Sequence, residues 1–412
     1  MKLKFSRNVN FKCKKKSKYK YLFSFLILLI LMLVLDKFFI NNTYATNSST
    51  EVEDQLNESV DEQLNSVDFS GYDNILNQLE GNFYGKNLSF KEIVKGILNG
   101  NYYSDYGSLL KTILSLLFNK IIEYVPLLLI IVAVSLLTQL LINFKGEKFD
   151  SGIVNVVNIM SLIVVVVIVV SIFKNIFESA FTTINLMEKQ SEILFPILLT
   201  FLTSMGSVVS VGIYKPVVAV LSTIITFVFT NFIYPIFIFA FVIAVLNRLS
   251  TSFKLSKLFN FINSLFKWVV GFIFTIFSAM LTIQGISAGK FDQISFKTTR
   301  FAIKSYVPIV GGYLSDGFDL VVLSSVLIKN SIGLAGIFII ISTILSPLIT
   351  IIVLKLLFQL ISSIVDILGH SKIAELLEDC SKLLLYPIVI ILCVAFMYFI
   401  SIGLIVCTSN IL

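Results

Sequence analysis

Asp316 and Asp319 are the residues whose type and spacing point most directly to chemistry, because they lie in an otherwise apolar stretch, Ser305–Gly333. A spacing of three places both carboxylates on one side of a helix. Charged groups at membrane depth are costly and usually face a protein interior or a wet cavity. The pair therefore indicates either part of an ion or solute path or, since glycines surround it, an irregular interfacial turn with solvated carboxylates.

Catalysis by these carboxylates is not indicated. An aspartyl intramembrane protease needs two aspartates on facing helices, whereas these two share one turn. A serine nucleophile needs a base, and the single histidine, His370, follows Gly369 at the expected start of a surface helix, where we expect it to be solvent-exposed. The sequence has no metalloprotease, P-loop or dinucleotide motif and no cysteine–histidine cluster. We expect no enzyme activity, no metal and no cofactor.

Three further polar residues interrupt apolar stretches and complete the candidate set for a pore or subunit interface: Gln284, Lys329 and Asn330. Lys329 and Lys355 have side chains long enough to snorkel to a membrane interface. Small residues nearby, such as Gly333 and Gly336, favour close contact between helices.

Composition defines the elements that must position these residues. The chain has 412 residues, of which 56% are hydrophobic and only 14% charged, and its mean hydropathy is +0.91. Apolar runs of about 20 residues can cross a bilayer as helices. The sequence therefore predicts an all-α, polytopic membrane protein with about seven to nine spanning or half-spanning helices. The expected spans are 122–143, 153–173, 193–213, 216–246, 268–288, 306–328, 332–354 and 383–407.

Four prolines mark candidate helix breaks, because proline removes a backbone hydrogen bond inside a helix. They are Pro196, Pro235, Pro308 and Pro347; the members of each successive pair are 39 residues apart, and the pairs are shifted by 112. This spacing suggests an internal repeat, which would be inverted if each half crosses the membrane three times.

The chain begins with a signal sequence, residues 1–45, in which nine basic residues within the first 20 precede the apolar run Tyr21–Leu35. Thr43–Ala45 fits a cleavage site, and an uncleaved anchor is the alternative. Either form places the next segment outside the cytoplasm. The net charge of +7 arises in this leader, so we expect no nucleic-acid partner.

Residues 46–121 form an acidic extracytoplasmic segment, and residues 122–412 form the polytopic membrane domain. Ser89 and Glu92 make a capping box before the apolar face of a short helix that Asn99-Gly100 ends. A weaker amphipathic pattern includes Leu56, Val60, Leu64 and Val67. Because so few large apolar side chains are present, we expect this segment to pack against the membrane domain or a partner, or to stay partly disordered.

Residues 282–337, which contain Gln284-Gly285, Pro308 and Lys329-Asn330, closely resemble the stage III sporulation protein AE family of endospore-forming bacteria. Residues 195–218, "FPILLTFLTSMGSVVSVGIYKPVV", also resemble that family, as does the order of leader, acidic segment and membrane spans. The long lysine-rich start departs from the family pattern.

The resemblance implies a membrane-embedded subunit of a multi-protein sporulation channel. It would be a multi-pass protein of the mother-cell membrane that surrounds the forespore. Its partners would be the lipid bilayer, other stage III AA–AH proteins and a forespore membrane protein across the intermembrane space. The channel would be required for late forespore development, and Asp316 and Asp319 would line a wet path or a subunit interface.

Two other function classes stay open from the residues alone. A stand-alone secondary transporter or permease is consistent with the suggested inverted repeat and predicts solute flux through the purified protein. A passive membrane scaffold is the second alternative, and it predicts that the acidic segment binds partner proteins while the spans tolerate polar substitution.

Overall fold

The computed structural model describes residues 50–78, 89–100, 106–143, 151–249, 255–306 and 311–408. The elements among them are helices, with no strand in these ranges. The chain divides into two compact units, Met1–Gln55 and Leu56–Leu412, and the described residues from Leu56 onward form the second. The leader expected over residues 1–45 lies outside the described residues.

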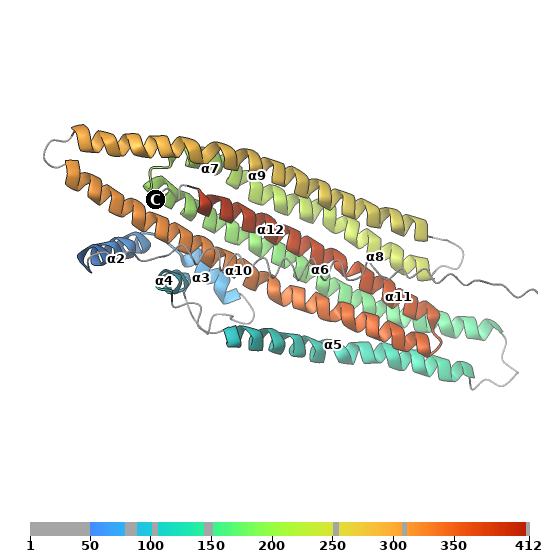
Figure 1. Cartoon of the computed structure of the whole chain (residues 1–412). Coiled ribbons are helices and arrows are strands. Elements are labelled where there is room, and N and C mark those ends of the chain that lie inside the picture. Colours follow the sequence, from blue (N-terminus) through green and yellow to red (C-terminus); the bar gives the residue numbers. More distant parts are fainter. Residues whose placement is uncertain are drawn as a thin grey trace, which may run out of the picture. The chain divides into compact units, whose positions relative to one another are not determined.

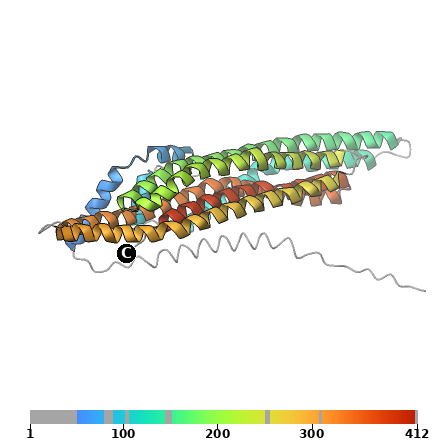
Figure 2. The same cartoon turned by 90° about the horizontal axis from the view of Figure 1, so that it is seen from above.

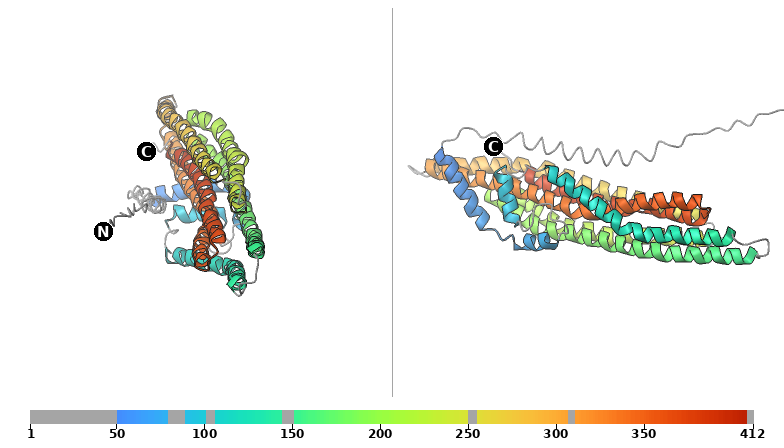
Figure 3. Two further views of the ribbon diagram at one scale, coloured as in Figure 1. Left: turned by 90° about the vertical axis from the view of Figure 1, so that its right-hand side faces the viewer. Right: turned by 90° about the horizontal axis from the view of Figure 1, so that it is seen from below.

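Long antiparallel helices lie side by side in this unit (Figures 1, 2 and 3). Short helices precede them near the start of the unit. In chain order the helices are α2 (Thr50–Asn65), α3 (Ser70–Gln78), α4 (Phe90–Leu98), α5 (Tyr106–Asn143), α6 (Ser151–Ser204), α7 (Val208–Val228), η2 (Phe229–Ile233), α8 (Tyr234–Leu249), α9 (Ser256–Tyr306), α10 (Gly311–Ile367), α11 (Ser371–Leu383) and α12 (Leu385–Cys407).

Six helical segments of the described chain are long and apolar enough to cross a membrane, which confirms the polytopic α-helical class. The number is below the expected seven to nine because α6 and α10 are each continuous through two expected spans. With 54 and 57 residues, they are about 81 and 85 Å long. A bilayer core is only about 30 Å thick, so both helices extend well beyond one crossing.

The helix breaks predicted at Pro196 and Pro347 are wrong, because α6 and α10 continue through them. A proline inside a membrane helix is tolerated where neighbouring helices shield the affected turn. Pro235 lies at the start of α8, directly after the π-helical turn Phe229–Ile233, so the interruption there is one widened turn. Pro308 lies outside the described residues.

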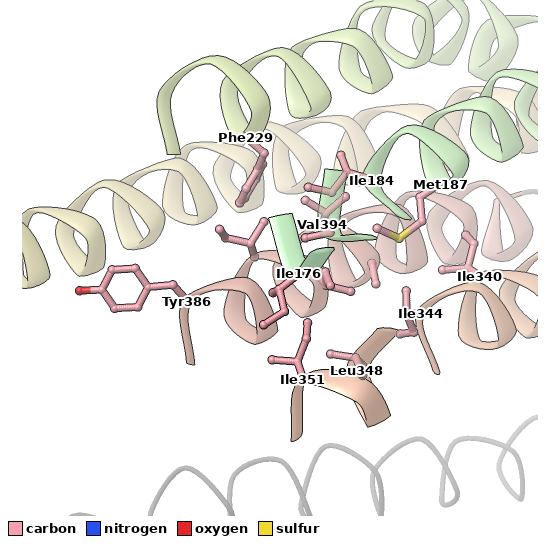
Figure 4. Close-up of a cluster of buried hydrophobic side chains, with 14 of the residues drawn as sticks. Ile176, Ile184, Met187, Phe229, Ile340, Ile344, Leu348, Ile351, Tyr386 and Val394 are labelled. Carbon is pink, nitrogen blue, oxygen red and sulfur yellow. The ribbon is translucent and has the colours of Figure 1, made fainter. Parts of the chain in front are cut away.

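The core of the unit forms where α6, η2, α10 and α12 meet. Ile184, Phe229, Ile344 and Val394 converge there from these four elements (Figure 4). Because lipid is as apolar as these side chains, close packing supplies most of the attraction between membrane helices. Aromatic pairs contribute to it: Phe173 of α6 stacks on Phe241 of α8 with ring centroids 4.2 Å apart.

The N-terminal helices pack on the long helices, as one of the alternatives for this segment predicted. The capping box of α4 is confirmed: Ser89 Oγ accepts from the Glu92 amide at 3.3 Å, and Glu92 Oε2 accepts from the Ser89 amide at 2.8 Å. The predicted apolar face of α4 is also buried. It packs against α10, while α3 packs against α6.

His370 is the N-cap residue of α11, but the expected solvent exposure is wrong, because only 7% of the residue is exposed. Gly369 precedes it with a φ of +90°, a conformation that favours glycine. This turn folds the histidine against α5, where it interacts with the backbone of Ser135. Burial lowers the pKa of His370 below its ordinary value.

Candidate functional site

Asp316 and Asp319 lie in the first turns of α10, where Asp316 is exposed and Asp319 is half-buried. Their spacing of three places them on one side of the helix, as predicted. Ten residues separate Asp319 from Lys329, a distance of about 15 Å along the helix, so the structure does not bring the aspartates and the lysine together. Their role in a wet path stays a prediction.

Lys329 is fully buried between α10 and α12, so the prediction that it snorkels to an interface is wrong. Its Nζ donates a 2.6 Å hydrogen bond to the carbonyl oxygen of Thr408, the C-cap residue of α12. The last carbonyls of a helix have no intrahelical donor and form the negative end of its dipole. The lysine therefore finds a charge-assisted partner inside the protein, which explains why its charge need not reach water.

Thr408 connects this lysine to a third helix. Its hydroxyl donates to the Leu404 carbonyl at 2.7 Å and lies 3.0 Å from the hydroxyl of Tyr214 in α7. The three helices α7, α10 and α12 are thus joined by hydrogen bonds at one end of the bundle. We refer to Lys329, Thr408 and Tyr214 as the lysine clamp.

The structure defines fewer contacts for Asn330 and Gln284, the two remaining candidate residues. Asn330 is half-buried, and its buried Oδ1 has no hydrogen-bond partner among the described residues. Gln284 lies in α9, and its side chain is outside the part of the chain that the structure describes.

A second polar cluster, which the sequence analysis did not identify, joins α2 to α10. Gln63 Nε2 donates to Ser324 Oγ at 2.6 Å, and Ser325 Oγ donates to Gln63 Oε1 at 2.8 Å. Ser59 lies 3.0 Å from Ser324 through its hydroxyl. The adjacent serines in an apolar stretch were the available signal. The cluster docks an N-terminal helix onto the helix that carries Asp316 and Asp319.

Helix α6 carries a third buried polar contact. Gln190 is fully buried and donates to Thr343 Oγ1 of α10 at 2.6 Å. Tyr72 of α3 donates to the Gln190 carbonyl at 3.0 Å and stacks on Phe90 of α4. Together these contacts place α3, α6 and α10 at a common level.

Charged side chains meet at the opposite end of the bundle from the lysine clamp. Arg248 of α8 donates through Nε and Nη2 to Asp379 Oδ2 of α11, at 3.0 and 2.5 Å, and its Nη1 pairs with Glu375. A guanidinium that contacts two carboxylates fixes α11 against α8.

These clusters position helices and show no catalytic arrangement. Within the described ranges, no group of three or more His, Cys, Asp or Glu side chains could hold a metal ion. The described cysteines, Cys380, Cys393 and Cys407, are free thiols. What the arrangement provides is a hydrogen-bonded helical bundle with a buried lysine inside it and charged groups on its surface.

Comparison with known proteins identifies similar chains. The family model for stage III sporulation protein AE matches residues 88–409. A curated protein from Bacillus subtilis (strain 168), named stage III sporulation protein AE, is 25% identical over 316 residues, which are 76% of this chain and 78% of that protein. No solved structure matches.

Proposed function

Because the chain belongs to the stage III sporulation protein AE family, we propose that it is a membrane-embedded subunit of the channel that joins mother cell and forespore during sporulation. Its partners would be the other stage III AA–AH proteins and a forespore membrane protein. Its place would be the mother-cell membrane around the engulfed forespore. Its part in the channel would be structural and conductive, without catalysis.

The observation that carries this proposal is the family match over residues 88–409, which includes the six candidate spans. Two structural features support it. The spans give the protein several membrane crossings, and the N-terminal helices are docked on them by the Gln63 cluster and by Tyr72. A rigidly held segment of this kind suits a subunit that presents a fixed surface to partners.

The test is deletion of the gene in its host, followed by microscopy of sporulating cells with a membrane dye and a late forespore reporter. We expect forespores that complete engulfment, then shrink while the reporter stays silent. Reintroduction of the native gene should restore both. Normal spores from the deletion strain would refute the proposal.

Partner binding is tested separately by purifying the tagged full-length chain from sporulating membranes and identifying co-purifying proteins. We expect other stage III AA–AH proteins. A matched variant, Gln63→Ala with Tyr72→Phe, should loosen the N-terminal helices and reduce recovery of partners that contact them. Recovery of the chain alone under mild detergent would argue against membership in a complex.

A further inference from the structure

The middle of α6 presents an exposed polar stripe to its surroundings. Between Lys174 and Thr200, the exposed side chains are seven polar ones and two apolar ones, Phe181 and Pro196. Spacings of three and four residues align most of the polar set along one side of the helix. The stripe consists of Lys174, Asn175, Glu178, Thr182, Lys189, Glu192 and Thr200.

This stretch of α6 lies at the same level as uncharged stretches of its neighbours. Phe173, just before the stripe, stacks on Phe241 of α8. Further along, Glu188 interacts with the hydroxyl of Thr226 in α7, which lies 3.4 Å from the hydroxyl of Tyr398. Tyr398 is inside α12, whose 23 residues include no charge. The stripe therefore runs alongside a helix that has the length and composition of one bilayer crossing.

Elsewhere at the level of Lys174–Glu192, Asn231 of η2 and Lys267 of α9 are exposed, and the other large exposed side chains of α7, η2, α8 and α9 are apolar. In α7, η2 and α8 they include Ile224, Phe227 and Phe232. In α9, Trp268 and Ile276 are exposed, and α9 is aligned with α12 because Phe266 stacks on Tyr386 with centroids 3.9 Å apart and Phe274 lies near Phe396. These helices present a surface suited to lipid, and α6 does not.

Helix α3, which packs on α6 at this level, is hydrophilic on its outward side. Tyr72 and Gly71 of α3 contact α6 at Gln190 and Ile193. The outward residues of α3, Asn74, Asn77 and Gln78, are exposed. A hydrophilic helix held against α6 at this level indicates that water, and not acyl chains, reaches this part of the surface.

Lipid contact along the stripe would be costly. Placing a lysine or a carboxylate at the centre of a membrane helix is strongly unfavourable. From Lys174 to Glu192 the stripe covers about 27 Å, nearly the whole bilayer core. Its charges form two pairs towards its ends, and the inner members, Glu178 and Lys189, lie about 5 Å inside those ends, within the membrane core. Lys174 and Glu178 are 72% and 64% exposed and 3.7 Å apart, which offsets only part of this cost.

We propose that the polar stripe of α6 lines a water-filled passage in the assembled complex, with α7, α8 and α9 directed towards lipid. This inference rests on the proposed function and assigns a wall of the conduit to named residues. The exposed charges of the stripe are two lysines and two glutamates, so the wall has no dominant sign. It suits small polar solutes of either charge better than cations alone or anions alone.

Cysteine accessibility tests the passage in membrane fragments from sporulating cells, which expose both membrane faces to reagent. The four native cysteines are replaced by alanine, and single cysteines are introduced in the full-length chain. Thr182→Cys and Lys189→Cys report on the stripe, with Phe227→Cys and Ile276→Cys as controls on exposed apolar positions at the same level. Thiols react as thiolates, which form in water, so stripe positions should react with a charged methanethiosulfonate at least about tenfold faster than the controls.

A second measurement needs no substitution and covers the case in which a variant fails to fold. A sulfonated amine-reactive ester applied to the native complex should modify Lys174 and Lys189 and leave the buried Lys329 unmodified. Stripe residues as unreactive as the controls would overturn the inference, as would efficient cross-linking of Lys189→Cys between two copies, since protein would then cover the stripe. Both readouts are independent of spore formation, so they can fail while the deletion phenotype still supports the proposed function.

Discussion

Gly333 of α10 faces Val406 of α12 so closely that a methyl group added at Gly333 would overlap the valine side chain. Valine has one strongly preferred rotamer in a helix, so it cannot turn away without strain. Gly333 also lies one turn after Lys329, and Val406 lies two residues before Thr408. The perturbation Gly333→Ala should therefore separate α10 from α12 at the lysine clamp.

The size of the effect follows from two opposing terms. An extra methyl group in a well-packed contact costs about 1–3 kcal/mol, and alanine in place of glycine inside a helix gains about 0.5–1 kcal/mol. We expect a net loss of about 1 kcal/mol in the free energy of unfolding. Gly403→Ala in α12 is the matched control, because nothing lies within 4 Å of its added methyl group; it should be neutral or slightly stabilising.

The assay is reversible unfolding in mixed detergent micelles, followed by the fluorescence of Trp268, the single tryptophan. Val406→Ala makes room for the methyl group, so the double variant Gly333→Ala with Val406→Ala should be more stable than the sum of the two single effects predicts. Equal behaviour of Gly333→Ala and Gly403→Ala, or strict additivity in the double variant, would refute the close approach of α10 and α12.

Three further predictions concern other parts of the chain. A double variant, Asp316→Asn with Asp319→Asn, should accumulate normally in the membrane and fail to support spore formation, since these carboxylates are expected to face a wet path or a subunit interface; normal spore counts would contradict that role. His370 has a lowered pKa, so its contribution to stability is complete above its unfolded pKa of about 6.5 and declines as the pH falls. The thermal unfolding temperature of the native chain should therefore fall more between pH 8 and pH 5.5 than that of His370→Gln. The same pH dependence in both would contradict the burial of the histidine. Ser89→Ala should lower stability by about 1 kcal/mol through loss of the α4 cap, whereas Ser89→Asp should retain most of it; amide exchange in α4 distinguishes these outcomes.

Local patterns in the sequence predicted local structure well. The capping box at Ser89, the apolar face of α4 and the stop at Gly100, whose φ is +68°, involve residues within one or two helical turns. Composition alone was sufficient for the membrane class, because an excess of apolar residues leaves too little charge to cover a soluble surface. The π-helical turn at Phe229–Ile233 fell inside the long uncharged stretch where an interruption was expected.

Contacts between distant segments could not be predicted in this way. Lys329 is buried because its partner is the end of a helix 79 residues later, and no spacing rule within α10 indicates that carbonyl. His370 is buried for a similar reason, since it interacts with the backbone of Ser135 in α5, and Gln139 of the same helix lies close to the preceding Gly369. Pro196 and Pro347 were expected to break helices because their local cost is known, while the neighbouring helices that make them tolerable are not visible in the sequence.

The polar stripe of α6 shows most clearly how the position of a charge depends on the structure of the segment that contains it. In the sequence, Lys174–Glu192 separates two apolar runs and has the composition of a loop between the expected spans 153–173 and 193–213. Once the segment is a continuous helix, the same charges fall on one side of it, and the contacts of Phe173, Glu188 and Gln190 place them beside uncharged stretches of the neighbouring helices. A search for charges that interrupt apolar runs finds Asp316 and Asp319 and overlooks the charges of α6. The structure places the two aspartates in the first turns of α10, where one is exposed and the other half-buried. The residues beside these uncharged stretches are therefore the ones that the sequence assigned to a loop, and the accessibility of Thr182→Cys and Lys189→Cys will decide whether water reaches them.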